Sequence, residues 1–562
     1  MKLDRIYLIF NTIKYLKFKQ LFYFVIRRGF KYRSVILNHN PVIRDDISLI
    51  ENIRVNDVCM DGSTFNFLNK SVSLKSESFN WDPDGEQRLW KYNLHYFDYL
   101  RARDCEQTIK ITLLSDWVKN NLQGSRPGWE PFTSSLRIVN WVSFLILNKK
   151  YIRPDINVVN SLYEQAMWLE KNDESHILAN HFFENIKALL FAGMFFSGKE
   201  ADRWRIKALD LIIIQLDEQI LADGGHYEKS PMYHSLMLEN MLDIYNLMIS
   251  NKSNFIEFTD FKLSFIKNKC KQSLDFLFDI VFPGNKIPLF NDSAFNIAPS
   301  PDELYNYAKD LFGYSKKSHN EFLISKGDSG LYGFKQAGNM FITDCGDIGP
   351  AYQPGHTHCD FLSYELMLDG QMFIVDSGVS EYELGALRQY QRSTKAHNTI
   401  SVDNGEQSEI WGGFRVARRA QKLQASIIQN YDSEVVFNGE YNGFFNIKGR
   451  INHSRNIVLS FISGSDSIKS YSVTDLVTGR GSHSIESYIH LHPEIQILQQ
   501  YDNRLILESS LGIRKVLYLD SDFSIEEYIY SPEFGINIKS NVVVLSRTGI
   551  LPIKLTYRIS HI

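Results

Sequence analysis

The stretch Phe361-Leu-Ser-Tyr-Glu-Leu-Met-Leu368-Asp369-Gly370-Gln-Met-Phe-Ile-Val-Asp376-Ser-Gly378 holds two apolar runs on either side of an Asp-Gly pair. An Asp-Gly pair between two apolar runs is the strongest short-range signal for a β-hairpin. The sequence therefore predicts two antiparallel strands joined by a tight turn. Because a hairpin returns the chain to the end from which it started, Asp376 comes back towards the loop that precedes the first strand.

That preceding loop, Pro354-Gly-His356-Thr-His358-Cys-Asp360, carries two histidines that are one residue apart. Another histidine, His397, lies in a polar loop just before a further strand pattern at residues 399–402. Two neutral imidazoles and one carboxylate form a ligand set that suits zinc. The sequence thus predicts a candidate metal site beside the hairpin.

The hairpin belongs to a half of the chain that is rich in short strand patterns. After about Lys326 the segments are short, alternating and rich in Ile, Val, Tyr and Ser, and turn residues separate them; residues 451–461 and 541–545 are examples. This pattern predicts an antiparallel β domain of many strands, most simply a β-sandwich.

The part between about Glu86 and Leu311 is helical in pattern. Residues 180–196, for example, place apolar side chains at i, i+3 or i+4 and i+7 spacing. Short breaks between such segments predict stacked helical hairpins. We expect an N-terminal helical segment and linker at residues 1–84, a helical domain at 85–325 and an antiparallel sheet domain at 326–562.

Two motifs of the helical half carry polar residues suited to chemistry. Asn180-His181 lies at an expected helix start, where asparagine is a good N-cap, so helix capping and a functional role are both open. The second motif, Asp223-Gly-Gly-His-Tyr-Glu-Lys-Ser-Pro-Met-Tyr-His234, crowds histidine, tyrosine and glutamate around a sharp Gly-Gly loop. Several proton-transfer groups beside a tight loop favour a functional site.

Length and composition limit the class of protein. A chain of 562 residues exceeds what one hydrophobic core organises, so two or three domains are expected. The formal net charge of −4 offers no basic footprint for nucleic acid, and we expect none to bind. The five cysteines are scattered, odd in number and without a CxxC pair, which favours a reducing compartment.

The first twenty residues are apolar and basic, but Asp4, Lys14, Lys17 and Lys19 interrupt their apolar runs. No small-residue cleavage site follows, and the stretch is too short to span a bilayer. It predicts an amphipathic helix that either packs on the body of the protein or presents a basic surface to the inner face of a membrane. We expect a cytoplasmic protein, peripheral to the inner membrane at most, without a signal peptide.

Several motifs occur together in an order that is specific. Besides Asn180-His181 and the loop at residues 223–234, they lie at residues 89–100, 128–141, 288–292, 355–360 and 411–415. In these motifs the chain resembles the heparinase II/III-type polysaccharide lyases, within the wider alginate-lyase and uronate-lyase superfamily. The resemblance covers roughly residues 85–420.

The resemblance implies an α+β multidomain fold, in which an incomplete (α/α) toroid precedes antiparallel β-sheets. It also implies β-elimination at a uronic acid of an anionic polysaccharide. The C5 proton of a uronic acid is weakly acidic because it lies next to the carboxylate. An enzyme must therefore damp the charge of that carboxylate, remove the C5 proton and protonate the O4 leaving group.

The resemblance places these roles on four residues. Asn180 would polarise the carboxylate of the uronic acid, and His181 would assist it or act as the base for one C5 epimer. Tyr233 would be the general acid, and a base where the geometry allows. His356 would act as the base or as a partner of the carboxylate.

The resemblance also assigns His358, Asp376 and His397 to a zinc ion that orders the loop carrying His356 and does no chemistry itself. Six further residues are expected to bind the substrate or line its cleft: Tyr227, Glu228, Trp129, Arg137, Arg392 and Trp411. For the tryptophans and arginines among them, positions in the core or in surface salt bridges are the alternative.

Two other functions stay open at this point. The superfamily also contains uronyl C5-epimerases, which share proton removal at C5 but return a proton to the opposite face; such an enzyme would act in capsule-type or O-antigen-type polysaccharide assembly. A glycan-binding protein without catalysis is the other alternative. The sequence leaves the polymer, its sulfation and the oligomeric state open.

Overall fold

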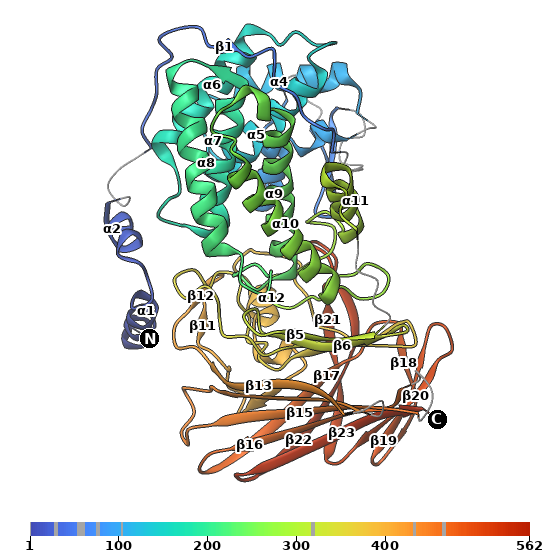
Figure 1. The fold of residues 1–562 in the computed structure, drawn as a ribbon. Coiled ribbons are helices and arrows are strands. Elements are labelled where there is room, and N and C mark those ends of the chain that lie inside the picture. Colours follow the sequence, from blue (N-terminus) through green and yellow to red (C-terminus); the bar gives the residue numbers. More distant parts are fainter. Residues whose placement is uncertain are drawn as a thin grey trace.

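The computed structural model describes residues 2–26, 32–52, 62–74, 79–102, 105–315, 321–430, 434–462 and 468–561. Figure 1 shows a group of helices stacked on a group of β-sheets, with the N-terminal helices α1 (Lys2–Ile13) and α2 (Phe18–Ile26) at one side. The expected α+β architecture, with helices first and antiparallel sheets second, is confirmed.

The helices of the first half pack against their neighbours along the chain, as stacked hairpins do. Serine, threonine and proline mark several of their starts: Ser300, for example, forms a capping box with Glu303 ahead of Pro301. The helices are α3 (Arg88–Tyr96), α4 (Gln107–Asn120), α5 (Pro131–Asn148), α6 (Ile156–Asn172), α7 (Ala179–Phe195), α8 (Lys199–Gln219), α9 (Pro231–Ser250), α10 (Asp260–Ile280) and α11 (Pro301–Phe312).

A five-stranded antiparallel sheet adjoins the helices, and both of its faces are buried. One face packs on Phe276 and Ile280 of α10, and the other packs towards the outer sheets. The strands of this sheet are β5 (Glu321–Lys326), β6 (Leu331–Gln336), β7 (Asn339–Asp344), β8 (Tyr364–Leu368) and β9 (Gln371–Ile374). Because both faces are covered, β7 and β8 are buried at every position, without the alternation expected of half-exposed strands.

Two further antiparallel sheets complete the β half. In β15 (Asn452–Phe461), buried and partly exposed residues alternate strictly, because only one face of the strand meets the core. The eight-stranded sheet has the order β13 (Gln421–Asn430), β14 (Glu434–Asn442), β15, β16 (Ile468–Thr478), β23 (Ile553–His561), β20 (Arg514–Leu519), β19 (Arg504–Ser509) and β18 (Ile495–Tyr501). The four-stranded sheet has the order β10 (Ile400–Val402), β17 (Ser482–His490), β22 (Ile538–Ile550) and β21 (Asp522–Tyr530).

The predicted hairpin is present as β8 and β9, with Leu368 paired to Gln371. Both turn residues, Asp369 and Gly370, have positive φ, which is what a two-residue hairpin turn requires. The first strand begins three residues later than the apolar run, because Leu362 has a φ of 60° and the chain turns there.

The N-terminal segment differs from the single helix that the sequence predicts. It forms two helices, α1 and α2, with a break at residues 14–17. In the ranges that the structure describes, no helix is both long and apolar enough to cross a membrane. A short hairpin of β2 (Thr64–Phe67) and β3 (Lys70–Ser73) also lies ahead of the helical domain.

Candidate active site

Tyr233 is placed by the Gly-Gly loop and by the start of α9. The side chain of Ser230 caps the helix by accepting the N–H of Tyr233, and Pro231 occupies the first helical position. A Cβ on Gly224 would lie 2.3 Å from the backbone oxygen of Gln272, and one on Gly225 would lie 2.0 Å from Ser329 Oγ. The loop therefore needs glycine at both positions to pack against its neighbours.

Asn180 and His181 lie in the first turn of α7. The N-cap is Leu178, which makes no side-chain cap, so the interpretation of Asn180 as the capping residue is corrected. Leu178 and Ala179 have φ values of 67° and 52°, so the backbone turns sharply just before Asn180. Asn180 lines a cleft. Its backbone N–H donates to Glu228 Oε1 at 3.2 Å.

His181 is held from two sides but stays open to solvent. Its Nδ1 lies 3.1 Å from Glu174 Oε1, and its ring lies over Phe132 with 4.5 Å between the ring centroids. The side chain is 42% exposed. Burial lowers the pKa of His181, but Glu174 more than offsets this and raises the pKa above its ordinary value. The geometry thus favours a cationic imidazole beside Asn180.

The helical half and the β half meet where Tyr233 stacks on His356. Their ring centroids are 3.8 Å apart, and the planes differ by 28°. The hydroxyl of Tyr233 lies 3.3 Å from that of Tyr382. Burial raises the pKa of the Tyr233 phenol above its ordinary value, so the group is a proton donor near neutral pH.

A buried carboxylate, Asp292, fixes the imidazole of His356. Asp292 Oδ2 lies 2.9 Å from His356 Nδ1 and accepts a hydrogen bond of 2.8 Å from Arg388 Nη2. Its Oδ1 pairs with Arg388 Nη1 and lies 2.8 Å from His358 Nε2. One carboxylate therefore holds both histidines of the His-x-His loop together with the arginine of helix α12 (Ala386–Gln391).

The charge of Asp292 is secured by these partners. Burial alone would raise the pKa of the Asp292 carboxyl, but Arg388 and the two histidines hold it well below its usual value. Because Asp292 is ionised, His356 directs an Nδ1–H at it and leaves Nε2 as the basic nitrogen. This Nε2 lies 3.4 Å from Glu228 Oε2.

Glu228 is buried between the helical side and the β side of the site and contacts a residue of each. It accepts from Asn180 on the helical side and faces His356 on the β side. Burial raises the pKa of Glu228 above its ordinary value, while His356 lowers it. Glu228 was expected to bind substrate, but its buried position makes it a support for Asn180 and His356.

The three expected metal ligands lie close together but are linked by hydrogen bonds. His397 Nδ1 lies 2.7 Å from Asp376 Oδ2, and the rings of His358 and His397 have centroids 5.3 Å apart. No group of three or more His, Cys, Asp or Glu side chains is arranged to hold a metal within the described ranges. Among the residues that the structure describes, the buried ring nitrogens His358 Nδ1 and His397 Nε2 nevertheless have no hydrogen-bond partner.

The donor set fits zinc in kind. Burial lowers the pKa of His358 to about 3 although Asp292 opposes the shift, so this ring is neutral, and neutral imidazole is the form that binds metals. The orphaned nitrogen of each ring is the atom that would meet a metal, and Asp376, which raises the pKa of His397 against the effect of burial, supplies the carboxylate.

Three residues expected at the cleft are buried elsewhere, which corrects their role. Trp129 packs between Trp117 and Trp168 in the helical core. Arg137 donates to Gln165 and to backbone oxygens and stacks on Trp117. Arg392 donates to the backbone oxygens of Thr357, Gly412 and Arg415 and so holds the loops behind the site.

Trp411 and Tyr227 also lie away from the cleft. The indole of Trp411 donates to Thr12 of α1 at 3.0 Å, and Arg415 lies over its ring. Tyr227 is buried with its hydroxyl 3.4 Å from that of Tyr352. Of the two tyrosines of the Gly-Gly loop, Tyr233 is therefore the one that faces the cleft.

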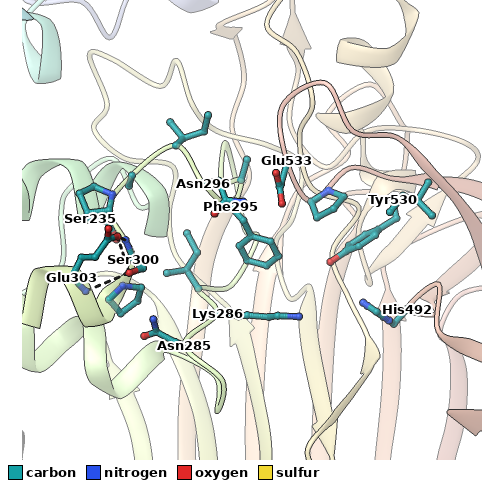
Figure 2. A pocket seen from close by; sticks show the side chains of 18 of the residues that line it. Ser235, Asn285, Lys286, Phe295, Asn296, Ser300, Glu303, His492, Tyr530 and Glu533 are labelled. Atoms are coloured by element: carbon teal, nitrogen blue, oxygen red, sulfur yellow. Dashed lines mark hydrogen bonds between the residues drawn. The ribbon is translucent and has the colours of Figure 1, made fainter. Parts of the chain in front are cut away.

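The cleft runs along the seam between the two halves. A cavity of about 340 Å³ is lined by Asn180, Tyr233 and Tyr382. A second cavity of about 920 Å³ shares lining residues such as Asn296 and Glu533 with the first. Figure 2 shows Lys286, Phe295, Tyr530 and His492 around this second cavity. The two adjoining cavities suit an extended ligand more than a single sugar.

Both basic and acidic side chains line the first cavity, and each of its two basic residues is paired with a carboxylate. Arg101 donates to Glu239 at 3.1 Å, and Lys187 donates to Asp243 at 2.7 Å. Four carboxylates contribute to the lining of this cavity: Asp98, Glu184, Glu239 and Glu533.

Three residues of the site were not among the expected ones: Asp292, Arg388 and Tyr382. Asp292 ends the motif at residues 288–292, which lies in the sequence between two motifs that contain histidines. A carboxylate in that position is a signal that could have predicted a partner for a histidine. Arg388 and Tyr382 carry no comparable local signal, because only the tertiary fold brings them to Asp292 and Tyr233.

Two family models match the chain in sequence. The model described as "Heparinase II/III N-terminus" matches residues 98–319, and the one described as "Heparinase II/III-like, C-terminal" matches residues 323–555.

Curated relatives are similar over part of their length. A heparin-sulfate lyase of Pedobacter heparinus is 26% identical over 320 residues, which is 52% of this chain and 47% of that protein. A heparin-sulfate lyase of Bacteroides stercoris is 23% identical over 318 residues, which is 51% of this chain and 45% of that protein. The chain thus spans about half the length of these relatives.

Solved structures share the fold at low sequence identity. A crystal structure of heparinase III has a TM-score of 0.69 and 17% identity, and the match covers 93% of this chain and 87% of that one. A heparan sulfate lyase from Pedobacter heparinus has a TM-score of 0.55 and 18% identity, with 89% and 81% covered. These similarities show that the chain shares the fold of these structures, a helical N-terminal region followed by antiparallel sheets.

Proposed function

Because the chain belongs to the heparinase II/III-type family, we propose that it is a polysaccharide lyase that cleaves a uronic-acid-containing glycan by β-elimination. The observation that carries the proposal is the contact between Tyr233 and His356 across the seam, with Asn180 on the wall of the same cleft. An acid, a base and a carboxylate partner then meet in one place, as the reaction requires.

The first task is to make the C5 proton removable. The Asn180 amide and the cationic His181 imidazole lie where they can pair with the carboxylate of the uronic acid. Their donors stabilise the negative charge that spreads onto this carboxylate as the proton leaves.

The proton transfers fall to His356 and Tyr233. His356 Nε2 accepts the C5 proton, and the carboxylates of Asp292 and Glu228 on either side of the ring stabilise the imidazolium that forms. Tyr233 gives its phenolic proton to O4 as the glycosidic bond breaks. Burial favours this role, because a raised pKa keeps the phenol protonated and disfavours Tyr233 as the base.

The decisive experiment is incubation with uronic-acid polysaccharides in D2O. A lyase produces an unsaturated uronate with new absorbance near the ultraviolet edge, and chain length falls. Deuterium at C5 without cleavage would instead identify an epimerase and refute the lyase.

Replacing the proposed acid separates catalysis from binding. We expect Tyr233→Phe to lower kcat by roughly 10²–10⁴-fold, which is the usual contribution of a general acid. Tyr227→Phe is the matched control, because the Tyr227 hydroxyl faces Tyr352 outside the cleft, and its kcat should stay near wild type. If wild type and Tyr233→Phe both bound the polysaccharide equally and neither cleaved it, the protein would be a glycan-binding protein without catalysis.

We further propose that His358, Asp376 and His397 hold a structural zinc ion. The two orphaned ring nitrogens and the neutral state of His358 support this ligand set. A zinc ion bound there would order the loop that carries His356, two residues from His358.

Metal content and thermal unfolding test the zinc proposal without reference to activity. Purified protein should contain close to one zinc per chain, and a chelator should lower the Tm. His397→Ala should remove both effects, whereas His453→Ala, in a buried cluster of the outer sheet, should keep the metal. Metal-free protein with a chelator-independent Tm would refute the site.

The charges of the cleft lead us to propose a substrate of low sulfation. Sulfates next to the uronic acid would meet the carboxylates that line the cavity, and like charges at close range are costly. Carboxylates and amides instead accept hydrogen bonds from sugar hydroxyls. We expect kcat/KM for an unsulfated uronate polymer to exceed that for a highly sulfated one by about tenfold or more; the reverse order would contradict this substrate class.

A further inference from the structure

The N-terminal helices expose an apolar surface. Phe10 and Phe18 are 69% and 83% exposed, and Ile6 is 64% exposed. Ile6, Phe10 and Ile13 are spaced i, i+4 and i+7 in α1, so they share one side of the helix, and Phe18 stacks on Phe22 in α2. We call the following residues the N-terminal face: Ile6, Ile9, Phe10, Ile13, Phe18 and Phe22.

Polar side chains of the same segment hold it against the body of the protein. Thr12 Oγ1 accepts from the Trp411 indole at 3.0 Å, and Gln20 Nε2 donates to the Tyr352 carbonyl at 3.1 Å. Between the two helices, Lys17 forms an ion pair with Glu218 of α8 at 2.6 Å. An amphipathic helix normally packs its apolar side on the core, whereas the most exposed side chains of α1 are apolar and the buried Asn11 is polar. This arrangement indicates that the apolar side meets something other than this chain.

Charge identifies the chemistry of that partner. Residues 5–44 contain nine lysines and arginines and no aspartate or glutamate. Because this segment contributes +9 to a total of −4, the other residues carry a formal net charge of −13. Arg5, Lys14 and Lys19 are exposed around the N-terminal face. The surface is therefore apolar at its centre and basic at its rim.

We propose that the N-terminal face docks on an anionic lipid surface. Phenylalanine and isoleucine side chains on one side of a basic helix enter the boundary between headgroups and acyl chains, and lysines and arginines pair with anionic headgroups. The cytoplasmic leaflet presents such a surface. The acidic remainder of the molecule is repelled by the same lipids, so only this side turns towards them. Figure 1 shows α1 and α2 together at one side of the molecule, where both can meet one plane.

Vesicle co-sedimentation tests the proposal with the full chain. The probes are vesicles of equal parts phosphatidylglycerol and phosphatidylcholine, compared with vesicles of phosphatidylcholine alone. We expect binding to the anionic vesicles that weakens as salt rises, and at least about tenfold weaker binding to the neutral ones. Equal binding to both, or none to either, would overturn the proposal.

Two sets of variants separate the apolar and the basic contributions. The triple variant Phe10→Ser, Phe18→Ser, Phe22→Ser should lower vesicle binding by about tenfold or more, because each phenylalanine loses its burial in lipid. Lys14→Gln with Lys19→Gln should reduce the salt dependence. The matched control replaces exposed apolar residues elsewhere, Ile256→Ser and Ile550→Ser, and should bind like wild type. A control that lost binding to the same degree would contradict the assignment to the N-terminal face.

Other occupants of this face give different results. If the face joined two copies of the chain, the triple variant would change the sedimentation velocity of the free protein, and wild type would ignore vesicles. If a protein partner covered it, wild type would stay monomeric and would also ignore vesicles. Either result overturns the proposal. Lyase activity on a soluble substrate and the Tm should stay unchanged in the triple variant, which shows that the fold is intact.

Discussion

In the described part of the chain, two buried Asp–Arg–His clusters have the same chemistry and different surroundings. In one, Asp292 binds Arg388 and both His356 and His358. In the other, Asp475 accepts two hydrogen bonds from Arg455, at 2.7 and 2.9 Å, and lies 2.8 Å from His453. In both clusters the pKa of the aspartate is lowered, since burial raises it but the arginine and histidine outweigh that effect.

The clusters differ in what they expose. The side chains of Asp475, Arg455 and His453 are fully buried in the outer sheet, whereas His356, which stacks on Tyr233 of the cleft wall, keeps 18% of its side chain accessible. The same kind of ion network thus stabilises the outer sheet in one place and positions a reactive imidazole in the other. A buried ion cluster is therefore no sign of catalysis by itself; the accessible histidine makes the difference.

The largest expected effect comes from removing the central charge in each cluster. Asp292→Asn and Asp475→Asn each leave a buried arginine without its carboxylate, which should lower the free energy of unfolding by about 3–5 kcal/mol. Chemical denaturation measures this loss. Only Asp292→Asn should also lower kcat per folded molecule, because His356 loses the partner of its Nδ1. Wild-type kcat in folded Asp292→Asn would show that Asp292 does not position His356.

Replacing one histidine in each cluster should separate the two effects: one variant should lose mainly kcat and the other mainly stability. His356→Gln should lower kcat by roughly 10²–10⁴-fold and should lower the free energy of unfolding by less than His453→Gln does, since 18% of the His356 side chain reaches solvent and none of the His453 side chain does. His453→Gln should lower stability by about 1–3 kcal/mol, because a buried acceptor loses a hydrogen bond, and should leave kcat unchanged. Steady-state kinetics and denaturation of both variants test the contrast, which fails if the two respond alike.

The smallest effect concerns a third pair, Glu174 with His181, in which the histidine is 42% exposed. Burial lowers the pKa of His181 but Glu174 raises it overall, so the stabilisation is full below the ordinary histidine pKa and is lost as the pH rises through the raised value. The pKa of Glu174 is lowered overall, although burial raises it, so its share is lost only as the pH falls through that value. Solvent screening limits the pair to about 1 kcal/mol or less.

Glu174→Gln measures this contribution. The difference in unfolding free energy from wild type should be largest below the ordinary histidine pKa and should shrink as the pH rises through the raised pKa of His181. Glu170→Gln, which removes the partner of Arg203, is the control and should show no such pH dependence over this range. A difference for Glu174→Gln that grew with pH would contradict the pairing.

Local patterns in the sequence predicted what local geometry determines. The Asp-Gly hairpin follows from its two turn residues, and the position of Tyr233 follows from a Gly-Gly loop and a Ser-Pro helix start. Arg455 and Asp475 lie opposite each other on the adjacent strands β15 and β16, so this ion pair follows from the register of the two strands. The resemblance added the toroidal form expected of the helical domain and the roles assigned to Asn180 and His356.

Long-range pairing was beyond local patterns. Arg388 and Asp292 are 96 residues apart in the sequence, and no periodicity or turn signal predicts a contact between them. Composition likewise could not separate Trp129 and Arg137, which pack together with Trp117 in the core, from aromatic and basic residues that line a cleft. The strands β7 and β8 of the five-stranded sheet are buried on both faces because helices cover one face and sheets the other, which depends on the tertiary stacking.

The position of Asp292 has a consequence for how this protein can be recombined. Asp292 lies in the segment that matches the N-terminal family model, whereas His356, His358 and Arg388 lie in the segment that matches the C-terminal one. The two halves are therefore not interchangeable parts. A chimera that joins the helical half of one relative to the sheet half of another inherits a positioned imidazole only if its new helical half supplies a carboxylate at this place. Shuffled libraries of this family should accordingly recover active members in which the residue at position 292 and the arginine at 388 travel together.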